Sequence, residues 1–199
     1  MNLPELWLLE WSPLEGIAAA FGVISVFLST RQNIWSWPTA IVNVALYTVV
    51  FYNGRLYGQM GLQAVYLVLS IYGWYQWLHG GEHRTALRVS RASPRLLAAL
   101  LALNLVAWLV LAAVLRQTDA ALPWLDALLT TTSLVAQWMM TRKIIENWAL
   151  WIAVDVVYVP MFWSQGLYAT ALLYTAFLVL AVMGLVEWRR SMQVGIRPL

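Results

Sequence analysis

The sequence predicts an all-α polytopic membrane protein with seven transmembrane helices, arranged 3+1+3 as two parallel three-helix repeats around one spacer helix. Of the 199 residues, 62% are hydrophobic and 11% are charged, and the mean hydropathy is +0.69. A soluble domain carries roughly a quarter charged residues. Apolar runs of about 20 residues, long enough to cross a bilayer, recur along the chain. The third observation is an internal repeat.

The repeat is found by shifting the sequence 111 positions along itself, which places residues 13–77 on residues 124–188 without a gap. The matched pairs include Trp37 with Trp148, Tyr47 with Tyr158, Gly73 with Gly184, and Trp77 with Trp188. Such a match is hard to obtain by chance. Two copies of one membrane unit are a known plan of secondary transporters.

The apolar segments predict helices in order along the chain. They lie at about 14–30, 35–53, 57–78, 95–115, 125–141, 147–164 and 167–187. Turns are indicated by Asn53-Gly54 and by Gln165-Gly166. The polar residues 79–94 form the one long loop.

These segments divide the chain into four parts. They are a first repeat at 13–77, a cytoplasmic loop and spacer helix at 78–123, a second repeat at 124–188 and a cytoplasmic tail at 189–199. Because a single helix separates the two units, both begin on the same side of the membrane. We therefore expect a pseudo-two-fold axis along the membrane normal.

The basic residues predict the orientation. Arg55 and Arg116 fall on the side of the N-terminus, and the other ten Lys and Arg fall on the opposite side. Basic residues accumulate on the cytoplasmic side, so we expect the N-terminus outside and the C-terminus in the cytoplasm. The pI of 9.4 is explained by this charge, and no nucleic-acid partner is expected.

Thirteen tryptophans are more than an interfacial belt requires. Those at the ends of spans are expected to be belt residues that face the membrane interface. They are Trp7, Trp11, Trp77, Trp124 and Trp188.

Asp155 is the leading candidate for a substrate contact. It lies near the middle of the sixth span, and Trp148 and Trp151 share its helix face at spacing i, i+3, i+7. A carboxylate at this depth costs roughly 2.5–3.5 kcal/mol and indicates a function. Beside two indoles it is suited to a flat cation, through Coulomb attraction and cation–π contact.

A second polar stripe lies on the fifth span. Its members are Asp126, Thr130, Ser133 and Gln137. We expect Thr130 and Gln137 to contact substrate, although Ser and Thr also serve as helix–helix contacts in membranes. In the first copy, the positions equivalent to the last three members are Ala19, Gly22 and Val26, so the lining is expected to be asymmetric.

Further candidates come from three other spans. Asn43 and Tyr47 are i, i+4 neighbours in the second span, Gln63 lies in the third, and Tyr174 lies in the seventh. Buried amides need hydrogen-bond partners that lipid cannot supply. We therefore expect these side chains to face a substrate site.

No metal or cofactor is expected. His79 and His83, with Glu82 between them, have no third ligand, and the chain has no cysteine. The sequence contains no nucleophile–base pair and no phosphate-binding glycine loop, so an enzyme is not expected.

Several motifs together resemble the PnuC family of bacterial vitamin transporters. They are Leu62-Gln63, Tyr72-Gly73-Trp74-Tyr75-x-Trp77, Thr141-Arg142-Lys143, Glu146-Asn147-Trp148-x2-Trp151-x3-Asp155 and Gly166-Leu167-Tyr168. The resemblance extends over nearly the whole chain.

The resemblance implies seven helices in a 3+1+3 arrangement and a homotrimer. It implies transport of nicotinamide riboside, or of a related compound such as thiamine, by facilitated diffusion, with later trapping by a cytoplasmic kinase. The implied contacts are Trp148, Trp151, Asp155, Asn43 and Gln63. Some relatives have Asn at the position of Asp155, and the residues alone leave the vitamin open.

The leading hypothesis is a nicotinamide riboside uniporter, and a thiamine uniporter is the alternative because thiamine is also a flat cation. A proton-coupled symporter would use Asp155 as its proton site. A sugar uniporter has no need of the acid, and a membrane enzyme or receptor scaffold has little support.

Overall fold

The structure, a computed structural model, describes residues 12–53, 55, 57–118 and 122–194. Trp7, Trp11 and Gly54, which entered the predictions above, lie outside these residues. Within the described part the chain forms seven α-helices and one short 3-10 helix. The α-helices are α2 (Pro13–Thr30), α3 (Ser36–Asn53), α4 (Tyr57–His79), α5 (Pro94–Leu115), α6 (Pro123–Thr141), α7 (Asn147–Ser164) and α8 (Tyr168–Val194).

The predicted helices are confirmed to within two residues at every boundary but one. The exception is α8, which continues to Val194 instead of ending at residue 187, so residues 189–194 of the expected tail are helical. The apolar run ends there, but Glu and Arg are good helix formers that extend the helix beyond it. The turn at Gln165-Gly166 is also confirmed, with Gly166 at a φ of 78°, a conformation that favours glycine.

Two helix starts follow from local sequence. The Ser12 hydroxyl accepts a hydrogen bond from the Glu15 backbone, and the Glu15 carboxylate accepts one from the Ser12 backbone, which forms a capping box before Pro13. Ser93 accepts in the same way ahead of Pro94. Proline fits the first helical position because it has no N–H to leave unpaired.

Three described helices are long and apolar enough to cross a membrane by length and composition. They are Pro13–Thr30, Pro94–Leu115 and Tyr168–Gln193. The other four α-helices have 18 to 23 residues, which at 1.5 Å per residue is about 27 Å or more. Polar residues such as Asn43, Gln63 and Asp155 lower their mean hydropathy.

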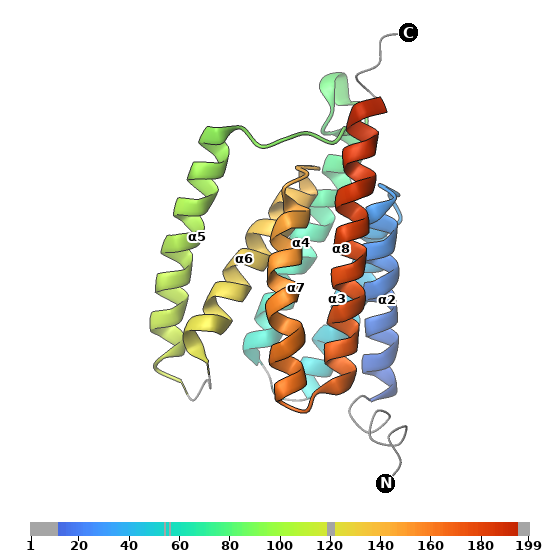
Figure 1. The fold of residues 1–199 in the computed structure, drawn as a ribbon. Helices are drawn as coiled ribbons and strands as arrows, with labels where there is room; N and C mark the ends of the chain where they lie inside the picture. The colour runs from blue at the N-terminus through green and yellow to red at the C-terminus, as the bar shows by residue number, and fades with distance from the viewer. Residues whose placement is uncertain (1–11, 54, 56, 119–121, 195–199) are drawn as a thin grey trace.

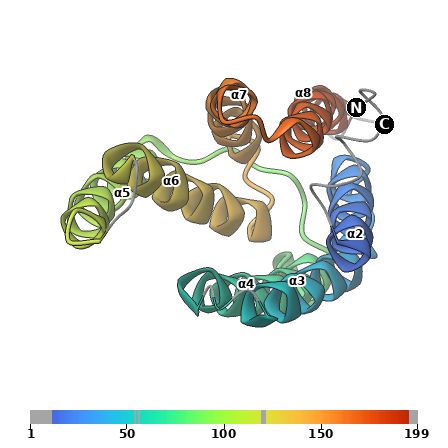
Figure 2. The same ribbon diagram turned by 90° about the horizontal axis from the view of Figure 1, so that it is seen from below.

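Six helices form a ring, in which each helix packs on the next in the order α2, α3, α4, α6, α7, α8 and back to α2 (Figure 2). Helix α5 lies outside the ring and packs on α6 (Figure 2). In Figure 1, α2 and α6 both begin at the lower end, and α8 ends at the upper end. The basic turn between α6 and α7 lies at the upper end as well.

Two indole hydrogen bonds join the ring near its upper end. Trp77 Nε1 on α4 donates to the Met140 carbonyl on α6 at 3.0 Å, and Trp188 Nε1 on α8 donates to the Ser29 carbonyl on α2 at 3.0 Å. The two donors, Trp77 and Trp188, are 111 residues apart, and so are the two acceptors, Ser29 and Met140. This is the offset of the sequence repeat. The rings of Trp77 and Trp188 also contact each other, with centroids 6.0 Å apart.

Two further tryptophans pack against glycines of a neighbouring helix. A Cβ added to Gly73 would overlap the Trp37 ring, and one added to Gly184 would lie 2.5 Å from the Trp148 ring. Both rings are also set edge-on against a second indole, at 90° and 86°. Glycine is therefore required at both positions for the indoles to be buried.

The belt assignment is wrong for two of the tryptophans. Trp77 and Trp188 are only 2% and 0% exposed, and both belong to the core cluster. An indole near a helix end faces lipid or protein according to the rotation of its helix, which span position alone does not reveal. Trp124, at 45% exposed, has the exposure expected of a belt residue.

The loop between α4 and α5 is hydrogen-bonded to the turn between α6 and α7. Ser90 forms a parallel bridge with Ile144, and the Ala92 backbone N–H donates to Glu146 Oε2 at 3.1 Å. These contacts connect the spacer segment to the ring.

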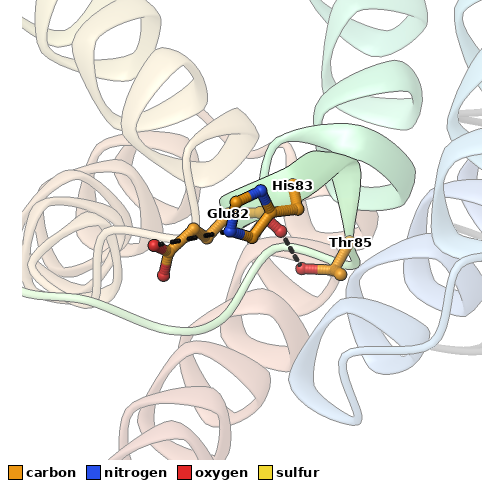
Figure 3. Close-up of polar contacts among 3 residues, drawn as sticks. All are labelled: Glu82, His83 and Thr85. Atoms are coloured by element: carbon orange, nitrogen blue, oxygen red, sulfur yellow. Dashed lines mark hydrogen bonds and ion pairs between the residues drawn. The ribbon is translucent and has the colours of Figure 1, made fainter.

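The tip of this loop contains the short helix η1 (Glu82–Arg84). Thr85 Oγ1 donates to the Glu82 carbonyl at 2.8 Å, and the Glu82 carboxylate lies 4.0 Å from His83 Nε2. Figure 3 shows both contacts. The Glu82 and His83 side chains are both about nine-tenths exposed. Such a pair contributes little to stability.

Candidate functional site

A cavity of about 1280 Å³ lies within the ring of helices and also reaches Leu111 and Leu115 of α5. All nine residues predicted to contact substrate line it, from five helices. They are Asn43 and Tyr47 on α3, Gln63 on α4, Thr130 and Gln137 on α6, Trp148, Trp151 and Asp155 on α7, and Tyr174 on α8. The structure therefore brings together residues that are up to 131 positions apart in the sequence.

The two ends of the cavity differ in their lining. Glu15 and Asp126, in the first turns of α2 and α6, line it at the lower end. Toward the upper end the lining reaches Ser29 and Met140, the two residues whose carbonyls accept the indole hydrogen bonds of the core. The tryptophan core thus borders the upper end of the cavity.

Lys143 lies at this upper end, in the turn after α6. Its Nζ is 4.4 Å from the centroid of the Trp77 ring and 3.4 Å from Gln32 Oε1. Burial lowers the pKa of Lys143 to about 8, because removal from water disfavours the charged form. At neutral pH the ammonium group still carries its proton and covers the indole face as a cation.

Asp155 is the buried acid of the cavity wall. Its side chain is 3% exposed, and within the described ranges no group donates a hydrogen bond to its carboxylate. Trp151, one turn before it, and Tyr158, one turn after it, line the same wall. A buried carboxylate without such partners favours an opposite charge that arrives from the cavity.

The two indoles beside this acid differ in accessibility. Trp148 is 1% exposed and is held between Gly184 and Trp188, so only part of its ring borders the cavity. Trp151 is half-buried. Of the two, Trp151 offers more surface on which a planar ligand can stack.

A cluster of aromatic side chains from α7 and α8 was missed in part by the sequence analysis. Tyr174 lies 4.8 Å from Tyr158 and 5.0 Å from Phe162, and Phe177 lies 5.8 Å from Tyr174, between ring centroids. All four line the cavity. The repeat contained a signal for Tyr158, because the offset of 111 aligns it with the predicted contact Tyr47.

The polar stripe of α6 faces the cavity as the spacing predicted. Its four members Asp126, Thr130, Ser133 and Gln137 all line it. On α2, the positions equivalent to Thr130, Ser133 and Gln137 also line the cavity. They are Ala19, Gly22 and Val26. The expected asymmetry of the lining is therefore present, with polar groups on α6 opposite small and apolar groups on α2.

Asn43 is oriented by a contact with α2. Its Nδ2 donates to the Ala18 carbonyl at 2.6 Å. A carbonyl can only accept, so the amide group of Asn43 is turned with its nitrogen toward α2.

The described part of the chain also contains a smaller cavity. It has a volume of about 130 Å³, lies among α5, α6 and the start of α7, and has a largely apolar lining. No group of three or more His, Asp or Glu side chains among the described residues is placed to hold a metal ion.

Comparison with known proteins identifies the family. A family model described as nicotinamide mononucleotide transporter matches residues 12–190, nearly the whole chain. The chain belongs to this family, which is the PnuC family. The resemblance found in the sequence motifs is confirmed, and the chain is a transporter and not an enzyme.

Two relatives and one solved structure show the breadth of the family. The riboflavin/roseoflavin transporter RibM of Streptomyces davaonensis is 28% identical, over 94% of this chain and 89% of its own. The nicotinamide riboside transporter PnuC of Escherichia coli is 28% identical, over 92% of this chain and 87% of its own. The crystal structure of the vitamin B3 transporter PnuC has a TM-score of 0.73 at 26% identity, covering 91% of this chain and 82% of that one.

Proposed function

We propose that the protein imports nicotinamide riboside across the bacterial cytoplasmic membrane by facilitated diffusion, and that a cytoplasmic kinase then traps the substrate by phosphorylation. Asp155 carries this proposal, because it is a buried acid that lines a large aromatic cavity without a hydrogen-bond donor in the described chain. Nicotinamide riboside is flat and positively charged. The carboxylate of Asp155 supplies the Coulomb attraction that such a ring favours, and the rings of Trp151 and Tyr158 supply the cation–π contacts.

Riboflavin is a second candidate, because RibM is similar over nearly the whole chain. The cavity of about 1280 Å³ exceeds the roughly 300–1,000 Å³ typical of small-molecule sites, so a tricyclic ring is not excluded by size. Riboflavin is neutral, however, and gives Asp155 no ion to pair with. Thiamine is the alternative to nicotinamide riboside that the cavity residues favour, because it is also a flat cation.

A binding panel distinguishes these candidates. The purified protein is titrated calorimetrically with nicotinamide riboside, thiamine, riboflavin and the neutral nucleoside inosine. We expect nicotinamide riboside to bind at least tenfold more tightly than inosine. Preference for riboflavin would contradict the proposed substrate, and equal binding of all four compounds would contradict a role for the acid.

We further propose seven membrane spans in two parallel repeats, with the C-terminus in the cytoplasm. The pair of indole hydrogen bonds related by the 111-residue offset supports the repeats. The common lower end of α2 and α6 supports their parallel direction (Figure 1). The excess of Lys and Arg at the upper end supports the orientation.

Reporter fusions test this topology. A fusion after Gly81 and one after Leu199 are expected to read as cytoplasmic, and one after Gln117 as external. Because Gln117 precedes the second repeat, a cytoplasmic signal there would show that the two units run in opposite directions.

The homotrimer implied by the resemblance is also a proposal. It is supported by α5, which lies outside the ring and exposes apolar side chains such as Leu101, Val106 and Val110. These residues fit either the lipid bilayer or another copy of the chain. The kinase is linked through its reaction and needs no physical contact with the transporter.

A further inference from the structure

One hydrogen bond between α2 and α3 fixes the direction of a cavity-lining amide. Asn43 Nδ2 donates to the Ala18 carbonyl at 2.6 Å, and Ala18 is fully buried. In an α-helix the carbonyl of residue 18 also accepts from the backbone N–H of residue 22. Asn43 thus reaches a carbonyl within α2 that is already bonded once.

Gly22 is what allows this approach. A Cβ at Gly22 would lie 3.0 Å from Asn43 Nδ2 and 3.5 Å from Phe177 Cζ. The first distance is tighter than an ordinary van der Waals contact, and the amide is held by its short hydrogen bond. Gly22 is itself buried and lines the cavity beside Asn43.

The consequence concerns the other end of the amide. Because its nitrogen is bonded to α2, its Oδ1 is directed away from the Ala18 carbonyl, and no donor within the described ranges bonds to it. Asn43 is half-buried and lines the cavity. An amide oxygen in such a place can accept a hydrogen bond from a ligand hydroxyl or N–H.

We propose that Gly22 is a positioning residue that makes Asn43 a fixed hydrogen-bond acceptor for a donor group of the transported vitamin. This inference rests on the proposed function for its ligand and deepens it. Asn43 selects a hydroxyl or amide N–H at one place in the cavity, and Gly22 acts only through Asn43. If the amide served only to hold two helices together, Gly22 would affect stability and leave ligand binding unchanged.

A double-mutant cycle with Gly22→Ala and Asn43→Ala tests the inference, and nicotinamide riboside is the probe. Each single change is expected to raise Kd about three- to tenfold, the loss of one neutral hydrogen bond. Because both changes remove the same contact, Gly22→Ala is expected to have no further effect on Kd in the Asn43→Ala background. Gly16→Ala, in the same helix with open space around its Cβ, is the matched control and should leave Kd unchanged.

Two results would overturn the proposal. One is an unchanged Kd in Gly22→Ala. The other is an equal rise in Kd from Gly22→Ala in the wild type and in the Asn43→Ala background.

Thermal unfolding of the same proteins tests the contact between Gly22 and Asn43 in the absence of a ligand. There Gly22→Ala is expected to lower Tm less in the Asn43→Ala background than in the wild type, and equal shifts would contradict the close contact. If the wild type bound no vitamin but the effects of the two substitutions on Tm were still non-additive, the proposed function would be contradicted. The fixed orientation of the Asn43 amide would still be supported.

Discussion

Replacing Asp155 with asparagine is expected to weaken binding of a cationic vitamin by about tenfold or more. Asparagine keeps the shape of the side chain and removes its charge. A cation about 4 Å from a carboxylate gains about 4 kcal/mol at an effective dielectric constant near 20, and part of this gain offsets the desolvation of both charges. Calorimetry with nicotinamide riboside measures the loss, where tenfold corresponds to about 1.4 kcal/mol.

Two comparisons make this result specific. Binding of neutral inosine is expected to be the same in wild type and Asp155→Asn. Asp126→Asn removes a carboxylate from the lower end of the same cavity and is expected to change the Kd of the vitamin less. An equal loss in both variants would mean that the overall negative potential of the cavity, and not contact with Asp155, attracts the cation.

The same variant separates uniport from symport. Proteoliposomes of the wild-type protein are expected to equilibrate the vitamin without accumulating it, with or without a pH gradient. Uphill uptake driven by the gradient, and abolished in Asp155→Asn, would instead assign the carboxylate to proton coupling.

Replacing Gly184 with alanine is expected to destabilise the protein severely. The new Cβ would lie 2.5 Å from Cε2 and Cζ2 of Trp148. That ring is 1% exposed and is set against Trp188 on another side, so it can yield only by leaving its packed position toward the cavity that it borders. Overpacking of a core typically costs about 1–3 kcal/mol, and more where nothing yields. The melting temperature in detergent measures the effect.

Gly16→Ala is the matched control for this substitution too, because nothing lies within 4 Å of its added Cβ. Introducing Trp148→Phe together with Gly184→Ala shortens the ring and is expected to recover part of the lost stability. If Gly184→Ala melted at the wild-type temperature, the close packing of Trp148 on α8 would be refuted.

The positions of the helices and the face that each turns inward were predictable from the sequence. A membrane segment must satisfy its backbone internally and keep polar groups away from lipid, so the stripe of Thr130 and Gln137 could only face protein or a cavity. The same reasoning placed Asp155 and Trp151 together. One helical periodicity therefore predicted which side chains would line the cavity.

The roles of individual indoles were not predictable in this way. Trp77 and Trp188 stand at the ends of apolar runs, where an interfacial tryptophan also stands, and only packing distinguishes the two. Trp148 was expected to stack on a ligand, yet most of its surface is used by Gly184 and Trp188. A signal was present in the glycine four residues before each end tryptophan, at Gly73 and Gly184.

The direction of the Asn43 amide and the bridge at Ser90 were equally beyond the sequence. Both depend on contacts between segments that are distant along the chain, at Ala18 and at Ile144. Spacing along one helix carries no information about such pairs.

The two indole hydrogen bonds have a consequence for biosynthesis, because the bonds are reciprocal. Trp77 of the first half donates to the second half, and Trp188 of the second half donates back to Ser29 in the first. A nascent chain that has inserted only its first helices has the Trp77 indole without its acceptor at Met140 and Ser29 without its donor. Neither half can complete these contacts until the ribosome has synthesised α8. The helices of the first half therefore remain incompletely packed in the membrane until those of the second half are inserted.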